Sequence, residues 1–116
     1  WLLSQVRQGY RVAIDPPLYG NRIHADDAAG LLAFLLQHVE QGGVLDKCYI
    51  GVDDAPAPLA DVVGWLREYL GVTEWAEDAS VRRAGSKQCS NARAKALGWV
   101  PTYPSYREGY AAILKG

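Results

Sequence analysis

The amino-acid sequence predicts an α/β fold that is mostly helical and carries two or three short strands. Three stretches of the chain support this prediction. Residues 28–41 carry apolar side chains on nearly every side of a helix, which is typical of a helix enclosed on all sides. Residues 59–70 repeat apolar side chains at helical spacing, whereas residues 10–14 alternate with the period of two that a half-buried strand shows.

The first part of the chain predicts the end of a helix followed by a strand. Trp1–Gln8 has the apolar spacing of the tail of a helix, and Gly9 is suited to close it. The strand over residues 10–14 is expected to stop at the Asp-Pro-Pro sequence of residues 15–17, because proline cannot donate to a sheet ladder. This part of the chain therefore contributes one short helix and one short strand.

A second strand and the long helix follow. Residues 22–25 read as a short strand, and Asp26 or Asp27 is expected to cap the helix by accepting its free amide groups. The helix continues through residues 28–41 and ends at the glycine pair that follows. A helix that is apolar all round needs packing partners on every side, so we expect it to belong to a larger protein.

The second half of the chain predicts one more strand and three more helices. Residues 47–52 form a short β-rich run before an acidic turn, and residues 59–70 form a helix with a single apolar stripe. The members of the stripe are Leu59, Val62, Val63, Leu66 and Leu70. Ser90 is expected to cap a further helix that runs through Leu97, and Ser105 opens the last helix with a Ser-x-x-Glu capping box.

Length, charge and cysteine content restrict the classes of protein. A chain of 116 residues without internal repeats is suited to one small domain spanning residues 1–116. The formal net charge of −1 argues against a nucleic-acid binder that acts through bulk charge. No apolar run reaches the roughly 18 residues that a membrane span needs. Cys48 and Cys89 are too few for a disulfide framework, so we expect two reduced thiols in a cytoplasmic protein.

Three motifs occur in a fixed order along the chain. The first is Asn-Arg-Ile-His-Ala-Asp-Asp at residues 21–27, and the second is Tyr-Ile-Gly-Val-Asp-Asp-Ala-Pro at residues 49–56. The third runs from Ser-Asn-Ala-Arg at residues 90–93, through Leu-Gly-Trp-Val-Pro at residues 97–101, to Glu-Gly at residues 108–109. In combination they resemble the motifs of the extended short-chain dehydrogenase/reductase superfamily, of the NAD-dependent epimerase/dehydratase type.

The resemblance implies that this chain is the C-terminal, substrate-binding part of a Rossmann-type enzyme. In this superfamily the N-terminal half binds NAD or NADP and supplies a catalytic Tyr and Lys. Neither a glycine-rich fingerprint nor a Tyr-x-x-x-Lys motif occurs in the sequence, so we expect no catalytic and no cofactor-binding residue in this chain. The lack of Met and the start at Trp1 are consistent with a chain taken from a longer protein.

Four residues are candidates for contact with the substrate of such an enzyme. Tyr19, Asn21 and Arg22 lie on the segment that, according to the resemblance, enters the substrate site. Lys87 is a further candidate. Many relatives carry an Arg four residues before the motif His, where it contacts the diphosphate of a nucleotide-sugar. Gly20 occupies that position here. This strand therefore lacks the arginine with which those relatives bind a nucleotide-sugar, and the resemblance implies only a small-molecule substrate, with a sugar derivative as one candidate.

Two charged clusters have a structural interpretation beside the functional one. His24 with Asp26 and Asp27 suggests a metal site or an acid/base pair, but aspartate caps are ordinary where a strand leads into a helix. Adjacent carboxylates without further His or Cys ligands do not converge on an ion, so we expect no metal. The second cluster is a run of basic residues between 82 and 95, referred to below as the basic run. It could clamp an anionic substrate, or it could form a solvated face paired with the acidic residues of 53–78. The residues of the basic run are Arg82, Arg83, Lys87, Arg93 and Lys95.

The aromatic residues also have a functional and a structural interpretation. A set of six could line a sugar-binding face, but their helical or post-helical spacing favours packing in the core. The six are Trp65, Trp75, Trp99, Tyr103, Tyr106 and Tyr110. We therefore expect these rings to stabilise the fold.

The sequence thus predicts the substrate-binding portion of an NAD(P)-dependent epimerase, dehydratase or reductase that is catalytically incomplete by itself. The alternative is a stand-alone, non-catalytic binding domain derived from the same fold. An exposed apolar helix face and an unpaired strand edge promote association. We therefore expect the chain to form a dimer through the strand around Tyr49 and the helix around Phe34.

Overall fold

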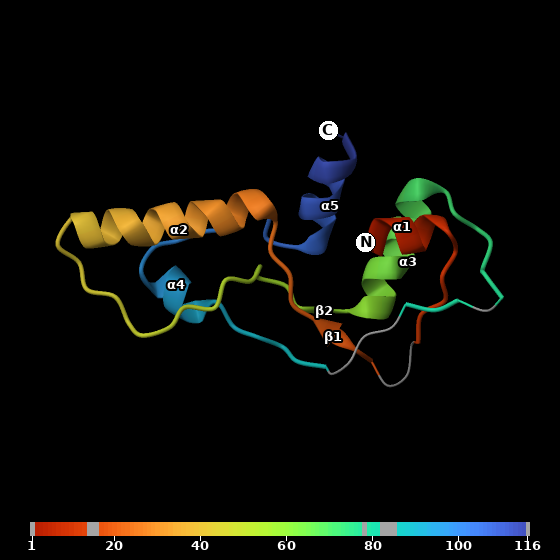
Figure 1. Ribbon diagram of the computed structural model, residues 1–116, viewed down its shortest axis with the longest axis horizontal. Coiled ribbons are helices and arrows are strands. Elements are labelled where there is room, and N and C mark those ends of the chain that lie inside the picture. The colour runs from red at the N-terminus through yellow and green to blue at the C-terminus, as the bar shows by residue number, and fades with distance from the viewer. Residues whose placement is uncertain (1, 14–16, 78, 82–85, 116) are drawn as a thin grey trace. The chain divides into compact units, whose positions relative to one another are not determined.

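The computed structural model describes residues 2–13, 17–77, 79–81 and 86–115 of the chain, and within these it is mostly helical (Figure 1). The elements in chain order are α1 (Leu2–Arg7), β1 (Tyr19–Gly20), α2 (Ala25–Glu40), β2 (Ala57–Pro58), α3 (Leu59–Leu70), α4 (Ala92–Ala96) and α5 (Tyr106–Lys115). The predicted class of a mostly helical α/β protein is confirmed, with one two-stranded sheet among the described residues.

The chain folds into two compact units. Unit 1 comprises Trp1–Gly20 and Ala57–Gln88, and unit 2 comprises Asn21–Pro56 and Cys89–Gly116. Each unit therefore combines an early and a late segment of the sequence. Unit 1 contains α1, the sheet and α3, whereas unit 2 contains α2, α4 and α5.

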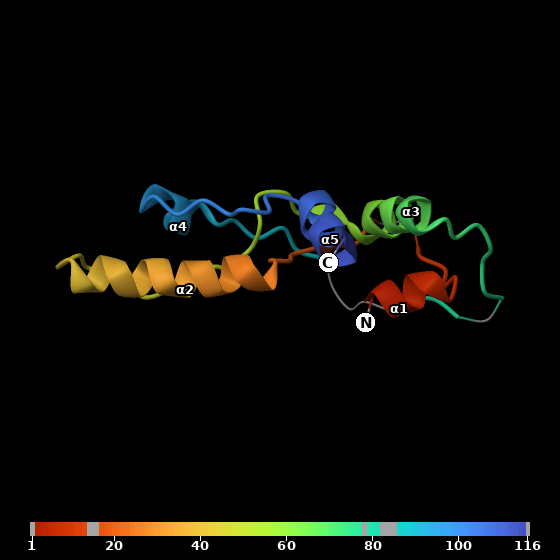
Figure 2. The ribbon, with the colours of Figure 1, turned by 90° about the horizontal axis from the view of Figure 1, so that it is seen from above.

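The core of unit 1 lies where α1 packs against α3 (Figures 1 and 2). Its fully buried side chains are Val6 of α1 and Leu59, Val62, Val63 and Leu66 of α3. The last four are members of the predicted apolar stripe, and each contributes about 1.5–3 kcal/mol through its burial. Gly71 ends α3 with a φ of 70°, as predicted for a helix C-terminus. Beside the stripe, Trp65 stacks on Tyr69 with ring centroids 5.2 Å apart.

The sheet of unit 1 consists of two residues from each strand. β1 runs antiparallel to β2, with Tyr19 opposite Pro58 and Gly20 opposite Ala57. Pro58 is tolerated because Tyr19 and Pro58 form a non-hydrogen-bonded pair of the antiparallel ladder, in which the nitrogen of Pro58 is not needed as a donor. The sheet fastens the segment before β1 to the start of α3, since the amide of Leu59 also donates to the carbonyl of Leu18 at 2.7 Å.

The strand predicted over residues 10–14 is wrong for its described part. A parallel bridge between Arg11 and Ser80 takes its place. The bridge consists of hydrogen bonds from Arg11 N to Ala79 O at 2.9 Å and from Val81 N to Arg11 O at 2.7 Å. A single bridged residue lacks the repeated bonds of a ladder. Residue 1 and residues 14–16, which the predicted helix tail, strand and stop signal include, lie outside the described residues.

The two strands predicted in unit 2 are also wrong. Residues 22–24 and 47–52 belong to no strand, and α2 already begins at Ala25. The two segments are joined by a backbone hydrogen bond from Asp53 N to Arg22 O at 2.7 Å. Alternating apolar residues favour an extended backbone, but a strand also needs a neighbour with which to repeat such bonds.

The N-terminal cap of α2 is His24 rather than either aspartate. Its Nδ1 accepts the amide of Asp26 at 3.0 Å. Asp26 is exposed in the first turn, where a negative charge complements the positive end of the helix. Asp27 is buried, and its carboxylate accepts the amides of Thr102 at 2.7 Å and Tyr103 at 2.8 Å. The predicted aspartate cap is therefore wrong, because Asp27 is committed to a tertiary contact.

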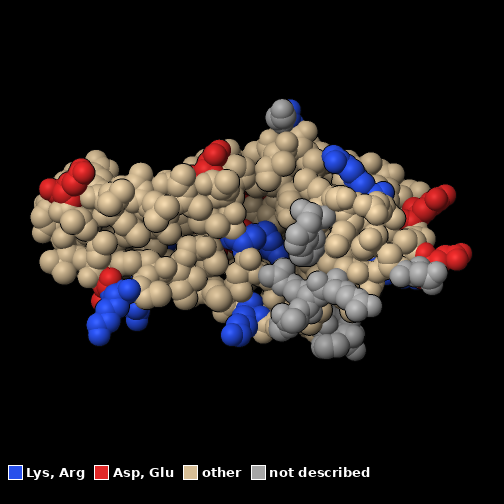
Figure 3. Space-filling model, viewed as in Figure 1, with Lys and Arg blue, Asp and Glu red and all other residues tan. Residues whose placement is uncertain are grey.

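One side of α2 packs within unit 2 and the other is exposed. Leu31 is buried in a cluster with Ala94 and Trp99. Leu32 and Leu36 remain 65% and 67% exposed, although the sequence predicted a helix enclosed on all sides. Figure 3 shows the result as a long uncharged surface with acidic residues at its two ends. No helix in the described part of the chain is long and apolar enough to cross a bilayer.

The last two helices begin near the predicted serines. The N-terminal cap of α4 is Asn91, so the predicted cap at Ser90 is wrong by one residue, although Ser90 Oγ accepts the amide of Ala92 at 3.2 Å. Gly98 follows the helix with a φ of 113°. Ser105 Oγ accepts the amide of Arg107 at 3.2 Å and donates to the carboxylate of Glu108. The Ser-x-x-Glu pair therefore caps α5, as the sequence predicted.

Candidate functional site

Unit 2 contains a pocket of about 130 Å³ between the segment that leads into α2, the acidic turn after Val52, and α5. The residues that line it are Arg22, Ile23, His24, Ala25, Asp53, Tyr103, Ser105, Tyr106, Gly109, Tyr110 and Ile113. An apolar cavity of about 150 Å³ holds a benzene molecule. The pocket is slightly smaller than that cavity, so its size corresponds to at most about one small ring.

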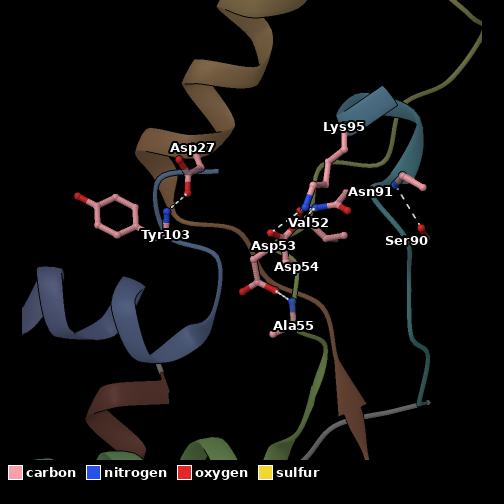
Figure 4. A network of polar contacts seen from close by, with 10 residues as sticks. Asp27, Val52, Asp53, Asp54, Ala55, Ser90, Asn91, Lys95 and Tyr103 are labelled. Carbon is pink, nitrogen blue, oxygen red and sulfur yellow. Dashed lines mark hydrogen bonds and ion pairs between the residues drawn. The ribbon is translucent and has the colours of Figure 1, made fainter. Parts of the chain in front are cut away.

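One wall of the pocket is fixed by the buried carboxylate of Asp27. By accepting the amides of Thr102 and Tyr103, it holds the chain before α5 against the first turn of α2 (Figure 4). The ring of Tyr103 then stacks on His24, with centroids 4.1 Å apart and planes tilted by 31°. The residue that caps α2 and a ring from the C-terminal segment thus form one surface.

The second wall combines a cation with an aromatic ring. The guanidinium of Arg22 lies over the ring of Tyr106, 5.8 Å from its centroid, which is within the range of a cation–π contact. Tyr106 is buried in the first turn of α5, so it presents a fixed surface to the arginine. The carbonyl of Arg22 accepts the amide of Asp53, and this bond fixes the backbone on both sides of the pocket.

Asp53 supplies a buried carboxyl group to the pocket. It is 4% exposed, and burial raises the pKa of its carboxyl above the ordinary value of 3.8. The hydrogen bond that Oδ1 accepts from the amide of Ala55 at 3.1 Å and the charge of Arg22 act in the opposite direction on this pKa. Asp53 therefore retains a proton at higher pH than a free aspartate and can serve as donor or acceptor.

The neighbouring Asp54 points instead into a structural network (Figure 4). The side-chain amide of Asn91 donates to Asp54 at 2.8 Å and to the carbonyl of Val52 at 2.9 Å, and the ammonium of Lys95 lies 3.1 Å from Asp54. Burial opposes ionisation of Asp54, but Asn91 and Lys95 outweigh it and hold its pKa below 3.8. The network connects the acidic turn to α4. The pKa values of the consecutive residues Asp53 and Asp54 are therefore shifted in opposite directions.

The pair of Lys95 and Asp54 also bears on the two interpretations of the basic run. It joins the basic run to the acidic residues of 53–78, as the structural interpretation expected. Arg93 donates to the carbonyl of Cys48 at 3.5 Å and contacts no pocket residue in this way. Arg82 and Arg83 lie outside the described residues.

The four residues predicted to contact substrate are divided between the units. Arg22 lines the pocket of unit 2, and Asn21 in the same unit accepts the amide of Cys89 at 2.8 Å through Oδ1. Tyr19 and Lys87 lie in unit 1, where the amide of Lys87 donates to the carbonyl of Tyr19 at 3.4 Å. Tyr19 and Lys87 therefore lie next to each other in unit 1. Of the four residues, Arg22 lines the pocket of unit 2.

The pocket combines polar and aromatic groups that could contact a ligand. It offers a guanidinium, a buried carboxyl, an imidazole and several phenol rings around a ring-sized space. Such a set suits a small ligand with an apolar face and polar edges. No group of three or more His, Cys, Asp or Glu that could hold a metal ion occurs among the residues that the structure describes.

Several residues of this site were interpreted differently from the sequence. Tyr103 and Tyr110 line the pocket, although the sequence favoured a place in the core. Asp53 lines it as well, while the bond from the amide of Ala55 to its Oδ1 confirms the predicted turn. The aromatic prediction holds for Tyr106 and for Trp99, which are 7% and 5% exposed. The spacing of Tyr106, Tyr110 and Ile113 along α5 is the signal that could have located the pocket, because it places their side chains on one helix face.

Comparison with known proteins gives one informative similarity. A solved structure from Methylobacillus flagellatus, provisionally assigned as an NAD-dependent epimerase/dehydratase, aligns with 98% of this chain at 31% sequence identity and a TM-score of 0.74. This chain spans 41% of that protein's length. No protein-family model matches the chain. No curated protein matches it either. The chain is therefore similar in fold and sequence to part of such a protein, which supports the resemblance inferred from its motifs.

Proposed function

We propose that this chain is the substrate-binding portion of an NAD(P)-dependent epimerase, dehydratase or reductase that acts on a sugar or alcohol. The observation that carries the proposal is the pocket of unit 2, where Arg22, Asp53 and aromatic rings surround a ring-sized space. The likeness to a protein described as NAD-dependent supports the same assignment. The chain would then be one C-terminal domain, catalytically incomplete without a Rossmann half.

The division of labour follows from the chemistry. NAD or NADP, held by the cofactor half, would supply hydride transfer. In this chain, the guanidinium of Arg22 would donate to substrate oxygens, and Asp53 would accept from a hydroxyl or donate to a carbonyl. The rings of Tyr103 and Tyr106 would cover the apolar face of the substrate. Asn21, Tyr19 and Lys87 remain proposed further contacts of the complete protein.

Ligand mapping by NMR on the labelled chain tests the proposal. We expect hexoses, pentoses or inositols to shift the amide signals of Arg22, Asp53 and Tyr106 in a saturable way. Arg22→Gln is expected to abolish these shifts, since it removes the cation from the pocket wall. Arg93→Gln removes a cation that does not line the pocket and is expected to leave them unchanged. The proposal fails if none of these compounds shifts the pocket signals, or if both variants behave alike.

A stand-alone, non-catalytic binding domain is the second candidate. It would use the same pocket of unit 2 to bind its ligand, and it differs from the first candidate in needing no cofactor half. The coding sequence upstream distinguishes the two candidates. A glycine-rich fingerprint after a strand, followed by Tyr-x-x-x-Lys, would establish the enzyme, whereas a short open reading frame without these motifs would favour the binding domain.

We also infer that the chain self-associates when it is alone, and that the contact uses the exposed face of α2. Leu32, Leu36 and Val39 lie on this face, each about half exposed or more, and such apolar surfaces promote association. Sedimentation at micromolar concentration is expected to show a dimer that Leu36→Glu dissociates. A wild-type chain that remains monomeric would contradict this inference.

The free thiols of Cys48 and Cys89 are consistent with the proposed cytoplasmic location.

A further inference from the structure

Unit 1 contains a second cavity that has no part in the proposed function. Its volume is about 420 Å³, and residues that line it include Arg11, Ala60, Asp61, Gly64, Arg67 and Trp75. Sites for small molecules generally measure about 300–1,000 Å³. This cavity is therefore large enough for a compound of one or two rings, more than the pocket of unit 2 can hold.

Each wall of the cavity is held by its own interactions. The floor is the face of α3 that carries Ala60, Gly64 and Arg67, beside the buried stripe. The second wall is the loop after α3, which Arg67 fastens by donating from Nη1 to the carbonyl of Glu74 at 2.9 Å. The third wall is Arg11, whose Nε donates to the carbonyl of Ala76 at 2.8 Å. The cavity is therefore formed before any ligand arrives.

An exposed tryptophan gives the cavity a flat surface. The guanidinium of Arg67 lies 3.6 Å from the centre of the ring of Trp75, which covers one face of the indole. Trp75 nevertheless remains 46% exposed, although the sequence favoured a place in the core. A planar aromatic ligand would cover this surface and stack on the indole.

Gly64 is a second feature that the fold alone does not explain. Glycine inside a helix is unfavourable relative to alanine, yet a Cβ at Gly64 would meet no atom within 4 Å. Packing within the described chain therefore does not require glycine at this position. The missing side chain keeps the floor of the cavity open and lets a ligand approach the helix backbone.

The charges of the lining residues select the sign of the ligand. Arg11 and Arg67 carry two positive charges, and Asp61 carries one negative charge, which leaves an excess of one positive charge at the cavity. We propose that this cavity binds a planar aromatic monocarboxylate, whose ring stacks on Trp75 and whose carboxylate pairs with Arg11. A planar guanidinium fork matches the geometry of a carboxylate.

The test uses 2-naphthoate as the probe and its uncharged amide, 2-naphthamide, as the matched control. In NMR titrations of the intact chain, 2-naphthoate is expected to shift the signals of Arg11, Gly64 and the Trp75 indole to saturation. The amide should bind about tenfold more weakly or worse, because it lacks the charge-assisted bond. Absence of saturable shifts, or equal affinity of the two compounds, would overturn the proposal.

Two variants locate the binding site. Gly64→Leu fills the cavity from its open floor and is expected to abolish binding while the spectrum of the fold persists. Gly30→Leu is its control, since a Cβ at Gly30 in α2 likewise meets no atom within 4 Å and Gly30 lies outside the cavity. If Gly64→Leu perturbs the fold, the milder Gly64→Ala should still weaken binding. Binding that survives both changes at Gly64 would refute the assignment.

Discussion

Replacing Asp27 is expected to destabilise unit 2 far more than replacing its neighbour Asp26. The two carboxylates are adjacent in the first turn of α2, so both complement the positive end of the helix equally. Only Asp27 accepts hydrogen bonds from the segment before α5, at 2.7 and 2.8 Å. The side chain of Asp26 is 76% exposed. The difference between the two variants therefore isolates the tertiary contact.

The magnitude follows from the number of acceptors that remain. A hydrogen bond to a charged group contributes about 1.5–3 kcal/mol. Asp27→Asn retains one acceptor oxygen and places an amide donor against the second backbone amide, so the loss should be about 1.5–3 kcal/mol. Asp26→Asn changes an exposed charge and should cost less than about 0.5 kcal/mol. Asp27→Ala removes both acceptors and should be the most damaging of the three.

Urea unfolding followed by circular dichroism measures these differences, with the slope compared between variants to confirm that the unfolded surface is unchanged. Hydrogen exchange at the amides of Thr102 and Tyr103 gives a local readout, and Asp27→Asn should accelerate it at these two positions. Equal losses for Asp26→Asn and Asp27→Asn would refute the reasoning. The carboxylate would then act through the helix end alone, as the sequence had suggested.

Further predictions concern two glycines of one helix and two consecutive aspartates. Gly64→Ala should stabilise the chain by about 0.5–1 kcal/mol in thermal unfolding, whereas Gly71→Ala should destabilise it by about 1 kcal/mol because its φ of 70° strains any side chain. Asp53 has a raised pKa in the folded state, so its contribution to the free energy of unfolding is present below pH 3.8 and is lost as the pH rises through the folded-state pKa. Asp53→Asn should remove this pH-dependent loss. Asp54 has a lowered pKa in the folded state, so its contribution to the free energy of unfolding is present above pH 3.8 and is lost as the pH falls through the folded-state pKa. Asp54→Asn should make the free energy of unfolding less dependent on pH in acid.

The sequence predicted the helices because their signals are local. The stripe of Leu59, Val62, Val63 and Leu66 fixed both the extent of α3 and the face that it buries. Ser105 marked the start of α5, since a capping box is complete within four residues. In each case the residues that decide the structure lie within one or two helical turns of one another.

The strands and the helix cap depended on partners that are distant in the sequence. Residues 47–52 have the composition of a strand, but composition does not supply the neighbouring strand that a ladder requires. Asp27 was correctly predicted to lie at the start of a helix, but its carboxylate accepts the amides of Thr102 and Tyr103 and does not cap the helix. Local propensity identified the junction, and a contact across 75 residues decided which side chain caps it.

The candidate site was predicted only in part for the same reason. Arg22 was selected because the motif places it before the helix, and it does line the pocket. Asp53 was assigned to a turn, and its role in the pocket depends on the bond that its amide donates to Arg22. A motif can identify a residue at a site, whereas the wall opposite it is set by the packing of α5.

A calorimetric titration of the isolated chain with NAD⁺, NADH, NADP⁺ and NADPH tests the central claim most directly. If the chain is a substrate-binding portion whose cofactor is held by a separate Rossmann half, none of the four should bind more tightly than the millimolar range. The sequence contains no glycine-rich turn to receive the pyrophosphate. Saturable micromolar binding of any one of these dinucleotides would contradict the account.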